Sequence, residues 1–172
     1  MRRTTVDDAP SDDGVWYFAY GSNLCRRVFV ETRCMRPRRA LRARLPGWRI
    51  CFDLPVGPGE RGVANVVECA DGTVYGVAYL LDLADAERLD RTEGVHRGWY
   101  RRHPIAAQLD DGVRLGAFTY RSPYGVPGRK PSARYLGLIL DGAREHGLPA
   151  AWIGWLGALE LAVDERLAVN RS

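Results

Sequence analysis

Two short segments of this sequence hold residues whose types and positions could do chemistry. The first reads Trp-Tyr-Phe-Ala-Tyr-Gly-Ser-Asn-Leu from position 16 to 24, and its uncharged aromatic half predicts a strand buried on both faces. Gly21, Ser22 and Asn23 end that strand, and successive backbone N–H groups in such a turn suit a carboxylate or a developing oxyanion. The same residues also suit an ordinary turn that ends a strand.

The second segment places Glu93 at the predicted C-terminus of a helix over residues 82–93. Asp82 is a suitable N-cap, and Gly94 suits the position just after the helix. A helix C-terminus carries a negative partial charge, so a carboxylate there is disfavoured, and burial would disfavour it further. A carboxyl group that can hold a proton suits general acid/base catalysis. The alternative is a solvated residue at a helix end, with arginines nearby.

Together these segments resemble the γ-glutamylcyclotransferase family. The resemblance rests on three motifs in the family's order and spacing. They are the loop 20–24, the segment 89–95 followed by Gly-Trp-Tyr at 98–100, and the run from Ser132-Ala-Arg-Tyr to His146-Gly-Leu-Pro. The motifs span about residues 16–158, which is most of the chain.

The resemblance implies an α+β fold, a small mixed barrel-like sheet with flanking helices. It also implies a reaction in which the α-amine of a γ-glutamyl group attacks its own γ-carbonyl. Ring closure then yields 5-oxoproline and releases the amine that had been acylated. Glu93 would be the general acid/base. Because nucleophile and electrophile belong to one molecule, positioning alone can supply much of the rate, and we expect no metal and no other cofactor.

The resemblance also implies which residues hold the substrate, a small-molecule γ-glutamyl compound. They come from the loop and from two tyrosines further along: Tyr20, Gly21, Ser22, Asn23, Leu24, Tyr120 and Tyr135. Tyr100 matches a third tyrosine position of the family, but core packing is the expected role there. The resemblance does not name the released amine, which could be an amino acid, another amine or a biosynthetic intermediate.

Most of the remaining sequence is predicted to form strands. Residues 41–52 make one candidate, and 62–69 with 73–81 are predicted to form a hairpin around Asp71-Gly72. A second hairpin, from 99–109 to 113–121, is predicted around Asp110-Asp111-Gly112. The apolar segment 147–159 is predicted to dock a last helix on the core through residues such as Trp152 and Leu156.

Length and composition predict one domain over residues 15–172, preceded by a disordered N-terminal tail over residues 1–14. The tail lacks the apolar segment of a signal peptide, and no stretch is long enough to span a bilayer. The four cysteines show no paired spacing, so reduced thiols in a cytoplasmic protein are expected, with no membrane association. The oligomeric state is left open.

Two further patterns point to other functions. Nine arginines lie between residues 25 and 49, which would suit a nucleic acid, but the chain has 24 arginines and a single lysine. Arginine is therefore its usual cation, and we expect a solvated face or the mouth of an anion site, with no nucleic-acid partner. Cys25 is a rival nucleophile, with His96 or His103 as its base. A non-catalytic domain of the same fold, binding a ligand or a partner, is the alternative function.

Overall fold

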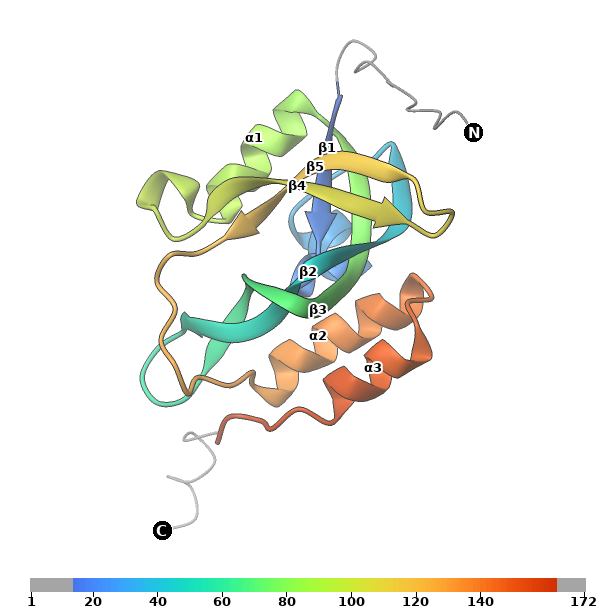
Figure 1. The fold of residues 1–172 in the computed structure, drawn as a ribbon. Helices are drawn as coiled ribbons and strands as arrows, with labels where there is room; N and C mark the ends of the chain where they lie inside the picture. Colours follow the sequence, from blue (N-terminus) through green and yellow to red (C-terminus); the bar gives the residue numbers. More distant parts are fainter. Residues whose placement is uncertain (1–13, 164–172) are drawn as a thin grey trace.

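Five strands close into a barrel in the computed structural model, which describes residues 14–163 (Figure 1). The strand order is β1-β3-β2-β4-β5, and neighbouring strands are antiparallel except for β1 and β5, whose parallel pairing at Tyr17 and Phe118 closes the barrel. The strands are β1 (Gly14–Ala19), β2 (Arg39–Pro55), β3 (Gly62–Asp82), β4 (Arg101–Leu109) and β5 (Arg114–Arg121). The mixed barrel with flanking helices confirms the predicted fold class.

Helices cover the barrel on two sides. Figure 1 shows α2 (Ala133–Glu145) and α3 (Ala150–Gly157) side by side below the long strands β2 and β3, with α1 (Leu83–Thr92) on the opposite side. Three shorter helical segments complete the described chain: η1 (Ser22–Leu24), the π-helix η2 (Arg27–Thr32) and η3 (Val95–Arg97). No helix within residues 14–163 is long and apolar enough to cross a membrane.

The predicted hairpin around Asp71-Gly72 is wrong, because β3 runs unbroken from Gly62 to Asp82 along β2. The register shifts where Pro46 pairs with Thr73 while Trp48 pairs with Glu68, so the extra residues of β3 are accommodated as a bulge. A Cβ atom at Gly72 would overlap the Trp48 carbonyl oxygen, and glycine is therefore needed for this close approach. The Asp-Gly pair makes a bulge here instead of a turn.

Several other sequence predictions are confirmed. The second hairpin forms from β4 and β5, with Arg101 paired to Arg121, and the helix that ends at Glu93 is α1. The last apolar helix is α3, which buries Trp152 and Leu156. The predicted tail lies outside the described residues except for Gly14, which already belongs to β1.

The loop after β1 is fixed from behind by α2. Ser132 caps this helix, because its hydroxyl accepts a hydrogen bond from the Tyr135 backbone N–H at 3.1 Å. Further along α2, Gly142 packs directly against the loop, so closely that a Cβ atom there would overlap the Leu24 carbonyl carbon. Leu24 is fully buried beneath this contact. The position of the loop therefore depends on a glycine in the last turn of α2.

We expect Gly142→Ala to destabilise the protein by about 1–3 kcal/mol, because the added methyl group overpacks the contact between α2 and Leu24. Gly137→Ala in the same helix is the control. Apart from the backbone of its own helix and its chain neighbours, no atom lies within 4 Å of the added Cβ, so alanine, the better helix former, should stabilise the protein by about 0.5–1 kcal/mol. Urea unfolding measures both, and equal stability of Gly142→Ala and wild type would contradict the close packing.

Candidate active site

A small pocket lies where the loop after β1, the end of α1 and the first turn of α2 meet. Its walls combine predicted loop residues, several tyrosines, Ala64 and Glu93. The complete lining is Tyr17, Tyr20, Gly21, Ser22, Asn23, Ala64, Glu93, Tyr100, Tyr120 and Tyr135. The structure thus brings together the predicted acid/base and all but one of the predicted substrate-binding residues. The exception is Leu24.

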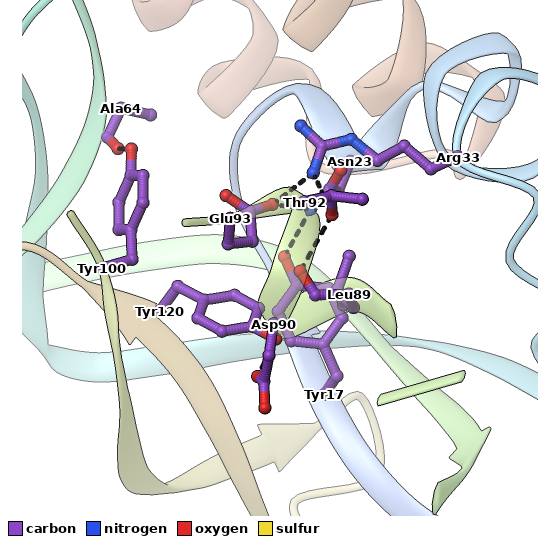
Figure 2. Close-up of polar contacts among 10 residues, drawn as sticks. All are labelled: Tyr17, Asn23, Arg33, Ala64, Leu89, Asp90, Thr92, Glu93, Tyr100 and Tyr120. Carbon is purple, nitrogen blue, oxygen red and sulfur yellow. Dashed lines mark hydrogen bonds and ion pairs between the residues drawn. The ribbon is translucent and has the colours of Figure 1, made fainter. Parts of the chain in front are cut away.

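Glu93 caps the C-terminus of α1, and the left-handed backbone of Gly94, with a φ of 69°, ends the helix directly after it. Its side chain is only 12% exposed. One carboxylate oxygen, Oε1, accepts hydrogen bonds from Asn23 Nδ2 at 2.8 Å and from Arg33 Nη1 at 2.7 Å (Figure 2). These donors offset the unfavourable helix terminus. Within residues 14–163 the second oxygen, Oε2, has no hydrogen-bond partner.

The Asn23 side chain is oriented by its amide nitrogen. Nδ2 donates both to Glu93 and to the Tyr17 hydroxyl at 2.8 Å, whereas the buried Oδ1 has no partner in the described part of the chain. Exchanging the two amide atoms would place Oδ1 against the Glu93 carboxylate, which accepts but does not donate. The backbone carbonyl of Asn23 is also held, because it accepts a hydrogen bond from the Tyr79 hydroxyl at 3.2 Å.

The loop itself offers a row of backbone donors. Leu24 and Cys25 donate their N–H groups back to Gly21 and Ser22, each at 3.0 Å, which closes a 3₁₀ turn. The N–H groups of Gly21, Ser22 and Asn23 precede that turn and have no acceptor within residues 14–163. Gly21 has an ordinary negative φ of −106°, but a Cβ atom there would lie 3.3 Å from the Tyr135 hydroxyl. Glycine therefore serves close approach here, and not an unusual backbone conformation.

Three of the pocket tyrosines donate their hydroxyl protons to the protein. Tyr20 donates to the Tyr120 carbonyl, Tyr100 to the Ala64 carbonyl and Tyr120 to Asp90 Oδ1, each at 2.6 Å. Tyr17 and Tyr135 instead accept, from Asn23 and from the Ala64 N–H. Among the described residues no acceptor takes the hydroxyl proton of Tyr17, so this proton is available to a ligand, whereas the Tyr135 hydroxyl also lies beside the Ser22 side chain.

Burial keeps these phenols neutral. It raises the pKa of Tyr135 to about 12 and raises the pKa values of Tyr17, Tyr20 and Tyr100 further above their usual range. The pKa of Tyr120 is raised by burial and also by its hydrogen bond to Asp90. The negative charge of Glu93 adds to each of these increases. The tyrosines can therefore donate hydrogen bonds at neutral pH but do not act as bases.

The structure corrects the prediction for Leu24 and adds to the one for Tyr100. Leu24 was predicted to bind substrate, but its side chain is buried against α2 and does not line the pocket, because it faces away from Asn23 in the same turn. Tyr100 was expected to pack in the core, and it does so with its hydroxyl bonded to the Ala64 carbonyl, but its ring also lines the pocket. The sequence signal for a place of Tyr100 in the pocket was the pair Gly94 and Gly98. Both adopt left-handed backbone conformations and bracket a tight turn between Glu93 and Tyr100.

Arg33 is the site residue that the sequence interpretation did not single out, because it lies within the arginine-rich segment that was assigned as a whole to a solvated face or the mouth of an anion site. Its side chain is 22% exposed and forms an ion pair with Glu93. The rival nucleophile Cys25 is buried and lies outside the pocket lining. No group of three or more metal-ligating side chains forms a possible metal site among the described residues.

Known proteins are similar to this chain in sequence and in fold. The model of the AIG2-like family matches residues 73–156. A γ-glutamyl cyclotransferase of Aspergillus oryzae is 34% identical over 160 residues, which cover 81% of this chain and 59% of the relative. The γ-glutamylcyclotransferase of Bos taurus is 30% identical over 171 residues, covering 93% of this chain and 87% of the relative. A solved γ-glutamyl cyclotransferase structure superposes with a TM-score of 0.77 over 91% of this chain at 24% identity, and so shares the fold.

We expect Asn23→Asp to destabilise the protein by about 1–3 kcal/mol at pH 8, because it replaces two donor hydrogens with a carboxylate oxygen beside Glu93. The penalty should shrink at pH 4, where a proton can occupy the carboxylate pair. Urea unfolding at both pH values measures this change. The control is Gln108→Glu on β4, an amide-to-acid change beside the cation Arg44. A penalty for Asn23→Asp that does not vary with pH would contradict the repulsion.

Proposed function

Because the chain belongs to the γ-glutamylcyclotransferase family, we propose that it cleaves a γ-glutamyl amide by intramolecular cyclisation, releasing 5-oxoproline and a free amine. One observation carries this proposal within the site. Among the described residues, Glu93 is held by one carboxylate oxygen while the other has no partner, in a pocket that also offers backbone N–H donors and the unpartnered Asn23 Oδ1.

The free groups of the pocket complement a γ-glutamyl group. Such a group presents an α-carboxylate and a γ-carbonyl oxygen, which accept hydrogen bonds, and an α-ammonium, which donates them. The loop offers the N–H groups of Gly21, Ser22 and Asn23, and Tyr17 adds a hydroxyl proton, so the oxygens of the substrate have donors. Oε2 of Glu93 is the acceptor for the α-ammonium.

The proposed reaction moves two protons from the α-nitrogen to the leaving nitrogen. Glu93, as the carboxylate, first takes a proton from the α-ammonium, and the neutral amine then attacks the γ-carbonyl carbon. Glu93 returns this proton to the amide nitrogen, and the C–N bond breaks as the tetrahedral intermediate collapses. The second α-nitrogen proton follows the same route, so that 5-oxoproline leaves with one N–H and the amine leaves protonated.

The protein's contribution to this reaction is placement and electrostatic stabilisation. Holding the α-amine over its own γ-carbonyl replaces a bimolecular encounter, and such an arrangement can supply a large effective molarity. Backbone N–H groups of the loop would bind the oxyanion that develops on the γ-oxygen, inside a pocket walled by neutral phenol rings.

The basic segment around β2 supports a small-molecule substrate over a nucleic acid. Arg38 is ion-paired with Asp82 at 3.0 Å, Arg42 with Asp110 at 2.7 Å, and Arg33 with Glu93. These arginines are partly neutralised by carboxylates of the same chain. This pairing reduces the positive charge that these three arginines could offer to a phosphate backbone.

The direct test incubates the protein with a panel of γ-glutamyl amino acids and γ-glutamyl amines and follows 5-oxoproline by liquid chromatography–mass spectrometry. Within this assay we expect Glu93→Gln to lower kcat by ~10²–10⁴-fold, because it removes proton transfer but keeps an acceptor oxygen for Asn23 and Arg33. Glu87→Gln, an exposed change on α1, is the matched control. Wild-type kcat in Glu93→Gln would rule out the acid/base role.

The chemistry of the nucleophile gives a second prediction. An N-acetylated γ-glutamyl compound should yield no 5-oxoproline, because its α-nitrogen is no longer a free amine. An α-linked glutamyl peptide should also be inert, because its γ-carboxylate is not an acylated amide. One assay that follows 5-oxoproline and free glutamate together checks both compounds. Release of glutamate from either one would indicate hydrolysis by water, and cyclisation would then be the wrong reaction.

A further inference from the structure

We infer that Arg33 is the positioning residue that orients Glu93 for proton transfer. This inference rests on the proposed function, and its observations are the contacts of the guanidinium and the backbone around it. Arg33 comes from the segment between η2 and β2, whereas Glu93 lies at the end of α1, 60 residues further along the chain.

The guanidinium is fixed both to the carboxylate and to the helix that carries it. Nη1 donates to Glu93 Oε1 at 2.7 Å and to the Thr92 hydroxyl at 3.0 Å. The Thr92 hydroxyl in turn donates to the Leu89 carbonyl at 2.8 Å, so its oxygen is held on the last turn of α1 (Figure 2). Arg33 therefore binds the end of α1 as well as the Glu93 carboxylate.

This arrangement decides which oxygen of Glu93 meets the substrate. Oε1 accepts from Arg33 and Asn23 together, so the carboxyl plane is set by two donors from different segments of the chain. Oε2 then remains for the α-ammonium. With Arg33 removed, only Asn23 would hold a carboxylate at an unfavourable helix terminus, and the group could rotate away from the reacting nitrogen.

The backbone on both sides of Arg33 is unusual. It follows a π-helix, and its own N–H closes the i→i−5 bond to the Val28 carbonyl at 2.9 Å. The next residue, Cys34, has a φ of 57° and is the one non-glycine position with a positive φ among residues 14–163. π-Helical turns and left-handed non-glycine residues are costly and concentrate at functional sites.

The segment is anchored while it carries this strain. Phe29 within the π-helix is fully buried and stacks on Tyr79, with ring centroids 4.4 Å apart. Met35, just after Cys34, is also buried, and its N–H donates to the Phe29 carbonyl at 3.1 Å. Because Phe29 and Met35 are both anchored, the backbone that carries Arg33 between them is fixed in position. A surface ion pair would need neither the strain nor the anchors.

The experiment compares Arg33→Met and Arg33→Lys with a matched control, Arg27→Met, which changes an exposed arginine of the π-helix that Arg33 follows. Arg33→Met should lower kcat by ~10–10²-fold, as expected for a misplaced reacting group, with KM within about threefold of wild type. Arg33→Lys should recover part of the loss, since it keeps the charge but not the guanidinium fork. Circular dichroism confirms that each variant is folded.

A double-mutant cycle separates positioning from general structure. In the Glu93→Gln background, Arg33→Met should cause no further loss of kcat, because Arg33 acts through the Glu93 carboxylate. Multiplicative losses, an unchanged kcat in Arg33→Met, or an effect confined to KM would each overturn the inference. Wild-type release of 5-oxoproline reports separately on the proposed function, because its absence from every compound of the panel would refute that function before any Arg33 variant is compared.

Discussion

The site depends on keeping a carboxylate at the C-terminus of a helix, where the aligned peptide dipoles oppose it. Glu93 stays there because Asn23 and Arg33 donate to one of its oxygens, and both donors come from far away in the chain, 70 and 60 residues before Glu93. No local segment can supply them. The barrel brings them together, since β1 leads into the Asn23 loop and β3 leads into α1.

The rest of the pocket wall consists of neutral groups around this carboxyl group and its Arg33 partner. Tyr20 and Tyr100 use their hydroxyl protons on backbone carbonyls of neighbouring strands or loops, and burial keeps both phenols neutral. Because the hydroxyls of these rings are already hydrogen-bonded, few groups must be reordered when a ligand binds, and the free-energy cost of that ordering is small. The pocket can therefore concentrate its electrostatic effect on the Glu93 oxygen and the loop N–H groups.

The sequence predicted the parts of this arrangement that local chemistry determines. An uncharged aromatic strand, a Gly-Ser-Asn turn and a helix that ends at Glu93-Gly94 are each legible within about ten residues, and all are present. The failures share one cause, which is dependence on distant contacts. Asp71-Gly72 becomes a bulge because β2 continues alongside it, and Arg33 differs from its eight neighbouring arginines only through a backbone path that residue types do not encode.

Leu24 shows why a recognisable motif mixes two kinds of residue. In one 3₁₀ turn, Asn23 faces the pocket and donates to Glu93, whereas Leu24 faces the opposite way and packs under Gly142 of α2. Asn23 makes the hydrogen bond to Glu93, and the packing of Leu24 fixes the position of the turn that carries Asn23. Since the pocket oxygens and N–H groups must be placed to within a fraction of an ångström, the apolar residue is as necessary to the site as the polar one. A motif resemblance identifies both residues together, and only the packing around the turn tells which of them reaches the ligand.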